Sequence, residues 1–237
     1  MYYRIYRPFL TREETPESYA YLYSEKYCDN REELIRYFQI LQNEVEEIFK
    51  YIEPNQDNFK VYSLKIYQIL VDVCIEIENN MKQILIANGY SKDKMNMRED
   101  YFLLKDLMHL DEYTVKLLIK NNKYELQPFK EWNSNEYTPL TWYQSYNKVK
   151  HSRSINYEDA NLENLLNSIA GLYILLYAQF YEFANCISFD NCTMLFLDDG
   201  NMYLTKKNSI FLISQKPNWK NEEKYLVMGN LEKYFLK

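Results

Sequence analysis

Glycine and proline are scarce in this chain, and their scarcity narrows the possible folds more than any other feature of the sequence. Only 4 glycines and 6 prolines occur among 237 residues. Tight turns depend on these two residue types, so a sandwich of many short strands would lack the turns that it needs. We therefore expect long helices and predict a mainly α fold, a helical bundle with a small β-hairpin or β appendage.

Three helices are expected in the first part of the chain. Apolar residues recur at steps of three and four over residues 31–52, with Glu and Lys between them, which is the spacing of an amphipathic helix. A longer helix is expected over residues 59–88, where Gly89 would end it. A shorter one is expected over residues 16–28, capped by Thr15.

The middle of the chain predicts shorter elements. Residues 99–110 suggest short helices, and two β-prone runs around an Asn-containing turn predict a hairpin at residues 114–127. A helix through Leu118 remains open as the alternative. Two further helices are expected, one opening at residues 138–139 and one beginning between residues 156 and 159.

The chain is expected to consist of two parts. Residues 1–190 would form the helical bundle, and residues 191–237 would form a small β region followed by a terminal helix from about Glu222. Short apolar runs around the turn "DDGN" support this change of pattern after Thr193.

Composition and charge exclude several classes of function. The net charge of −6 disfavours attraction of the whole molecule to nucleic acid or anionic lipid, so any such contact must be local. The apolar segment 165–181 falls short of the roughly 20 residues that a membrane span needs. No secretory leader is recognised, and we expect a cytoplasmic protein that does not contact membranes.

Cofactor and metal chemistry find no support in the sequence. The four cysteines form no CxxC pair and have no clustered histidines beside them. The chain lacks a Gly-rich phosphate loop, an HExxH pair and a GxSxG elbow. We expect no cofactor and no metal site, and we interpret His109 as incidental.

One basic segment, "WYQSYNKVKHSR", interrupts this acidic chain, which has no acidic residue between Tyr137 and Tyr157. On a helix, one face within about a third of the circumference would carry Tyr143, Asn147, Lys150 and His151. Such a face combines an ammonium, an amide and an imidazole, which can bind a phosphate and exchange protons near neutral pH.

Two points about this segment remain open. A helix face with two lysines, Lys148 and Lys150, and one histidine is often only solvated surface. On a straight helix Arg153 would also lie about 160° from His151. The arginine can therefore join the face only if the helix ends or bends there.

The chain resembles the HEPN superfamily of helical proteins, which includes many bacterial toxin, antiviral and stress ribonucleases. The resemblance rests on the run "YNKVKHSR" at a helix end with the apolar helix "ANLENLLNSIAGLYILL" after it, and on "IEIENNMKQIL" in the earlier long helix. It covers about residues 60–185. Family ribonucleases carry an arginine four to six intervening residues before the histidine, and those places are Gln144, Ser145 and Tyr146 here.

The resemblance implies an RNA-directed protein in bacterial defence or toxin-like regulation, as a metal-independent endoribonuclease. His151 would be the general acid or base, and Lys148, Lys150 or Arg153 would stabilise charge on the phosphorane.

The binding residues would be Asn147, Tyr143 and Glu78. Asn147 would orient the phosphate, and Glu78 would position or tune the histidine from the facing helix. Family members often build the site across a two-fold dimer, so a homodimer is expected. The alternative from another class is a noncatalytic protein that uses the same helices to dimerise or to engage a protein partner.

Overall fold

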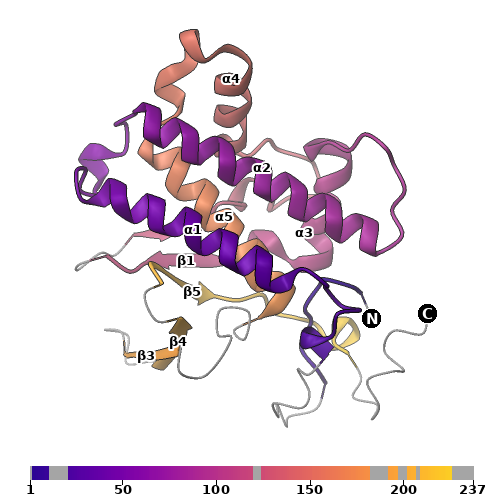
Figure 1. Cartoon of the computed structure of the whole chain (residues 1–237). Coiled ribbons are helices and arrows are strands. Elements are labelled where there is room, and N and C mark those ends of the chain that lie inside the picture. Colours follow the sequence, from indigo (N-terminus) through magenta and orange to yellow (C-terminus); the bar gives the residue numbers. More distant parts are fainter. Residues whose placement is uncertain are drawn as a thin grey trace.

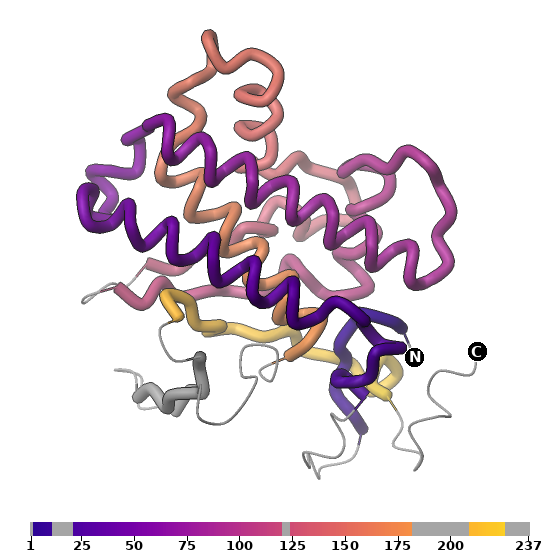
Figure 2. The backbone as a smooth tube through the Cα atoms, in the orientation of Figure 1, coloured from indigo at the N-terminus to yellow at the C-terminus, as the bar shows by residue number. Residues whose placement is uncertain are grey.

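The computed structural model describes residues 2–10, 21–119, 124–181, 192–196, 202–206 and 209–225. It is mainly helical with a small antiparallel sheet, which confirms the predicted fold class (Figure 1). Helices α1 and α2 lie side by side, helix α5 packs behind them, and the sheet lies along one edge of the bundle (Figures 1 and 2).

Helix α1 (Arg31–Phe49) follows the amphipathic pattern that the sequence predicts. Its buried face includes Leu34, Phe38, Leu41 and Val45, which recur at steps of three and four. Arginine and glutamate side chains occupy much of the remaining surface, so burial of the apolar stripe is what holds this helix on the bundle.

Helix α2 (Leu64–Ala87) begins later than expected, because Ser63 caps it and accepts a hydrogen bond from the backbone N–H of Ile66. The backbone before Ser63 has another function. The carbonyls of Phe59 and Val61 accept hydrogen bonds from the first N–H groups of helix α5, at 3.0 and 2.9 Å. These carbonyls satisfy donors that a helix start leaves unpaired.

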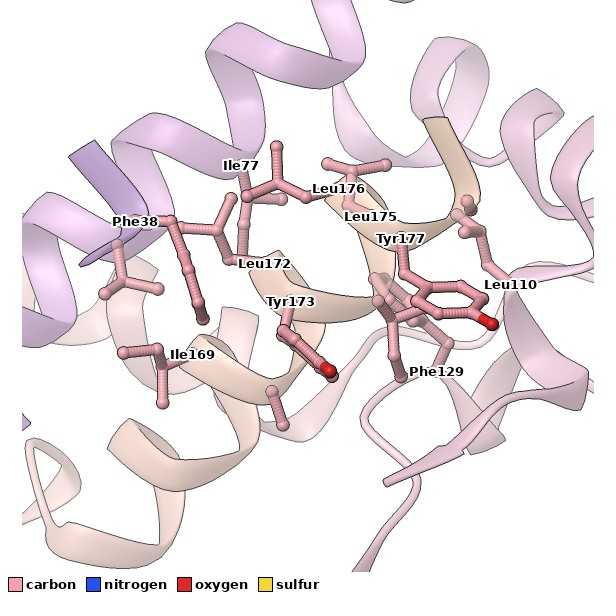
Figure 3. Close-up of a cluster of buried hydrophobic side chains, with 14 of the residues drawn as sticks. Phe38, Ile77, Leu110, Phe129, Ile169, Leu172, Tyr173, Leu175, Leu176 and Tyr177 are labelled. Carbon is pink, nitrogen blue, oxygen red and sulfur yellow. The ribbon is translucent and has the colours of Figure 1, made fainter. Parts of the chain in front are cut away.

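Helix α5 (Leu162–Phe180) is the centre of the core. All of its residues except Glu163 and Asn167 are buried, and Figure 3 shows side chains from several elements around it. Full burial of each large apolar side chain contributes about 1.5–3 kcal/mol. The apolar segment that could suggest a membrane span is thus a core helix, and within the described ranges no helix is long and apolar enough to cross a membrane.

Helix α4 (Thr141–Asn156) packs on α5 and α2 and carries the basic segment. Its backbone departs from helical angles at Ser152, with φ −149° and ψ 66°, so the helix bends there. A short 3-10 turn, η6 (Tyr157–Asp159), joins it to α5.

Several short elements connect the long helices. They are η2 (Gln56–Asn58), the π-helical turn η3 (Met97–Tyr101), α3 (Leu103–Met108), η4 (Leu110–Glu112) and η5 (Lys130–Trp132). The short helices expected at residues 99–110 are confirmed.

The predicted hairpin at residues 114–127 is confirmed, since β1 (Thr114–Leu117) pairs antiparallel with β2 (Glu125–Leu126). Its turn at residues 120–123 lies outside the described residues. On its other edge β1 pairs antiparallel with β5 (Phe211–Gln215), giving the strand order β2-β1-β5. The carboxy-terminal region therefore contributes a strand to the sheet of the bundle.

A second pair, β3 (Cys192–Phe196) and β4 (Met202–Lys206), forms an antiparallel ladder. It confirms β structure after residue 192, while the turn "DDGN" lies outside the described residues.

The two expected end helices differ from what the structure describes. Residues 21–23 form a 3-10 turn rather than the end of an α-helix, and residues 11–20 lie outside the description. Near Glu222 the chain forms the 3-10 turn η9 (Asn221–Glu223), and the carbonyl and N–H of Tyr225 then bond to the amino-terminal segment. Residues 226–237, where most of the terminal helix was expected, are also outside the description.

Candidate functional site at the bent end of helix α4

The basic residues of α4 lie at the surface of the protein. Lys148, Lys150, His151 and Arg153 are all exposed. Buried side chains on the same helix anchor them, namely Trp142, Tyr146 and Val149, which are at most 2% exposed. The core therefore fixes the rotation of α4 and so determines which side chains reach solvent.

A hydrogen bond joins this helix to α2. The hydroxyl of Tyr143 donates to Oε1 of Glu78, with 2.6 Å between the oxygens. Burial raises the pKa of Tyr143 well above its ordinary range, and the Glu78 carboxylate raises it further. Tyr143 thus remains a protonated donor, and two of the residues named for the site are in direct contact.

Lys150 lies on the same side as this pair. Its ammonium donates to the Tyr146 hydroxyl at 2.8 Å. That hydrogen bond raises the pKa of Lys150, and the nearby Glu78 carboxylate also raises it. Lys150 therefore keeps its positive charge beside the Glu78–Tyr143 pair.

Lys148 lies on another side of the helix. Residues two positions apart on a helix point about 200° apart, so Lys148 and Lys150 project in nearly opposite directions. The Lys148 ammonium lies 3.2 Å from a carboxylate oxygen of Asp159. The two lysines of the basic run therefore lie on different sides of α4 and do not form one cluster.

Arg153 could share the face of His151 only if the helix ended or bent nearby, and the helix does bend at Ser152. Instead of continuing along a straight helix, the Arg153 guanidinium lies over the Tyr67 ring of α2, 5.3 Å from its centroid. This side of α4 faces α2, where Lys150 also lies. An arginine and a lysine are thus placed at the boundary between the two helices.

His151 precedes the bend and is exposed. It makes no hydrogen bond or ion pair with any other residue that the structure describes. Asn147, one turn earlier, is half-buried. Glu78 accepts its hydrogen bond from Tyr143 rather than from His151, so the imidazole of His151 is open to an external group.

The arrangement offers specific chemistry. An open imidazole can transfer protons near neutral pH, and cationic side chains around it can stabilise a negatively charged phosphate. Of the three places that could hold the family arginine, Gln144 is exposed, whereas Ser145 and Tyr146 are 5% and 0% exposed. Only Gln144 could present an arginine to solvent without changing the core.

His109 has contacts that the sequence did not reveal. Its two ring nitrogens lie 2.6 Å from a Glu112 oxygen and 2.9 Å from a Glu223 oxygen. The spacing of three residues could have suggested the contact with Glu112. The contact with Glu223 joins residues 114 positions apart, which the sequence does not indicate, and it ties the carboxy-terminal region to the bundle.

In the part of the chain that the structure describes, no group of three or more His, Cys, Asp or Glu side chains is placed to hold a metal ion. Cys28 and Cys74 are buried free thiols.

Comparison with known proteins found no matching family model, no matching curated protein and no matching solved structure.

Proposed function

We propose that the bent end of α4 binds RNA and that the protein is a HEPN-like, metal-independent endoribonuclease. The observation that carries the proposal is the exposed His151, open to an external group, directly before the bend that places Arg153 against α2. The bent end of α4 is a local cationic surface on a chain whose net charge is −6. Because the chain as a whole repels RNA, contact with the phosphate backbone requires such a local surface.

The proposed reaction is attack of a ribose 2′-hydroxyl on the neighbouring phosphorus. The 2′-oxygen forms the new P–O bond, the bond to the leaving 5′-oxygen breaks, and a cyclic phosphate remains. His151 takes the proton from the 2′-hydroxyl or gives one to the leaving oxygen. Lys150 and Arg153 stabilise the charged phosphorane, and Asn147 orients the phosphate.

Lys148 supports binding rather than charge stabilisation at the reacting phosphate, because Asp159 already partners it. Glu78 acts through Tyr143 by fixing the rotation of α4 against α2. The cytoplasmic location and the role in bacterial defence or toxin-like regulation belong to the same proposal, which rests there on the HEPN resemblance.

The test is cleavage of mixed structured and single-stranded RNA in the presence of EDTA. Wild type should leave cyclic phosphate ends, and His151→Ala should lose about 10²-fold or more of the rate. The matched control is Lys94→Gln, an exposed cation in the loop after α2, which should cleave like wild type. Equal cleavage by wild type and His151→Ala would refute the assignment.

A second variant asks whether the family arginine can be supplied. Gln144→Arg places a guanidinium at the one exposed position among the three, and we expect it to raise the cleavage rate. A Gln144→Lys variant controls for charge alone, since lysine lacks the planar fork that pairs with phosphate.

The alternative is a noncatalytic protein that dimerises through the same end of the bundle. Exposed apolar side chains there favour it, because Ile155 is 79% exposed, Leu64 52% and Tyr62 48%. Sedimentation of wild type and Ile155→Asp distinguishes the two readings. A dimer that Ile155→Asp dissociates, together with RNA that wild type neither binds nor cleaves, would favour the interaction protein.

A further inference from the structure

A second candidate site lies in a cavity of about 450 Å³ on a different side of α2. It is bounded by the start of α1, the second half of α2 and the amino-terminal segment. Tyr3 exchanges two hydrogen bonds with Asn88 just beyond α2, at 2.9 and 2.8 Å, and so fixes that segment. The volume is within the range of about 300–1,000 Å³ typical of small-molecule sites.

An arginine lines this cavity without a carboxylate partner. Arg4 is only 5% exposed and has a left-handed backbone, with φ 58°. Its Nε donates to Gln179 and its Nη2 to Asn80, at 3.1 and 3.3 Å. A guanidinium has five N–H donors, so the other three have no acceptor among the described residues.

The side chains that hold Arg4 are themselves buried and connected. Asn80 is 1% exposed and Gln179 is 0% exposed. Gln179 Nε2 donates to the same Asn80 oxygen that receives Arg4, at 3.1 Å. Burial lowers the pKa of Arg4, and the nearby Asp29 and Glu76 carboxylates offset part of that shift. Buried charges are ordinarily paired, so an anionic group is the partner that this guanidinium needs.

Carboxylates surround the same cavity. Asp29 and Glu33 line it and form no ion pair with any residue in the described ranges. Glu76 also lines it and accepts a hydrogen bond from Asn80 at 2.8 Å. Burial raises the pKa of Glu76 above its ordinary range. The cavity therefore joins one buried cation to an excess of acidic groups.

We propose that this cavity binds a small zwitterion, an α-amino acid with a cationic side chain. The ligand's carboxylate pairs with the free N–H groups of Arg4, for which a planar carboxylate is the best geometric match. Its ammonium and its side-chain cation face Asp29, Glu33 and Glu76. The exposed ring of Tyr37 covers the aliphatic part or stacks on a guanidinium.

Other ligands fit the charges less well. A polyamine would satisfy the carboxylates and leave the buried Arg4 facing further positive charge. A phosphate or an RNA backbone would pair with Arg4 and be repelled by the surrounding carboxylates. Glu76 and Glu78 are two residues apart on α2 and so project in nearly opposite directions. The cavity is therefore separate from the proposed RNA site.

The test is isothermal titration of the full-length protein with L-arginine and L-lysine. We expect saturable binding with a Kd of about 1 mM or tighter. Agmatine, which lacks the carboxylate, should bind at least about tenfold more weakly than L-arginine, and L-citrulline, which lacks the side-chain charge, should also bind more weakly. Binding of agmatine as tight as that of L-arginine would overturn the role of Arg4.

A matched pair of variants locates the site. Glu33→Gln removes a cavity carboxylate on the exposed surface of α1 and should weaken L-arginine binding about fivefold. Glu32→Gln, its exposed neighbour outside the cavity lining, should bind like wild type. Both substitutions are on the surface, so thermal melts should confirm intact folding. The proposal fails if neither amino acid binds, or if both variants bind equally.

Discussion

The hydroxyl of Tyr143 in α4 donates a hydrogen bond to Glu78 in α2, with 2.6 Å between the oxygens. This contact joins the helix that carries the basic residues to the longest helix of the bundle. Because α5 packs against both helices, the orientation of the basic surface depends on core packing and on this hydrogen bond between α2 and α4.

Tyr143→Phe should therefore destabilise the fold by about 1 kcal/mol, since it removes a hydrogen bond to a charged acceptor while keeping the ring. Urea unfolding measures the change. Glu78→Gln should cost less, because the amide oxygen still accepts the bond. Tyr137→Phe is the control, since the Tyr137 hydroxyl makes no hydrogen bond with other described residues. Equal losses for Tyr143→Phe and Tyr137→Phe would contradict the prediction.

The division of the two lysines leads to a prediction about RNA binding. Lys150 is charged and lies beside α2, whereas Lys148 is paired with Asp159. Lys150→Gln should weaken RNA binding at low salt and reduce the slope of log K against log salt by about 0.7, the value for one contact with a single strand. Lys148→Gln should change the slope less. Filter binding at several salt concentrations measures both, with Lys94→Gln as the charge control.

Periodicity was sufficient to locate the long helices. The steps of three and four in α1 and the apolar run of α5 follow from how each helix meets the core, so the local sequence contains the needed information. The start of α2 was predicted too early, although Ser63 is a local capping signal directly before Leu64. Phe59 and Val61 lie outside the helix, and their carbonyls accept hydrogen bonds from the first N–H groups of α5. A contact between segments so far apart in the sequence has no local signal.

The candidate site shows the same limit. Helical geometry identified the residues that share a face with His151, and it identified a bend as the condition for Arg153. It could not show that Ser152 bends or that Tyr67 receives the arginine. It also could not show that Glu78 contacts Tyr143, because that depends on the rotation of α2 against α4.

Gly171, in the middle of α5, allows a stabilising substitution. A Cβ atom built there would lie 3.5 Å from Trp142 and 3.6 Å from Phe129, which are ordinary contact distances. Gly171→Ala should raise the free energy of unfolding by about 0.5–1 kcal/mol, because alanine restricts the unfolded chain and favours the helix. Gly171→Leu should destabilise the protein by overpacking. Thermal and urea unfolding distinguish the outcomes, and a loss of stability in Gly171→Ala would show that the core cannot accept one methyl group.

The final prediction concerns acid stability and rests on Asp100, which is 0% exposed in the π-helical turn. Its carboxylate accepts hydrogen bonds from Tyr90 Oη at 2.5 Å, from Lys92 Nζ at 2.9 Å and from the backbone N–H of Asn96 at 2.7 Å. Burial acts to raise the pKa of Asp100, but these hydrogen bonds outweigh it and hold the pKa below the ordinary value of 3.8.

A carboxyl with a lowered pKa in the folded state stabilises the fold above its unfolded pKa, and the contribution is lost as the pH falls through the folded value. Wild type should therefore lose stability relative to Asp100→Asn as the pH falls from about 5 to below 3.8. At pH 7 the variant should be the less stable protein, because an amide replaces a charge that receives hydrogen bonds from three donor groups. Urea unfolding at several pH values measures the difference. The control is Asp93→Asn, which changes an exposed aspartate in the adjacent loop. If the difference in unfolding free energy between wild type and Asp100→Asn stays constant with pH, the Asp100 carboxylate does not govern acid stability.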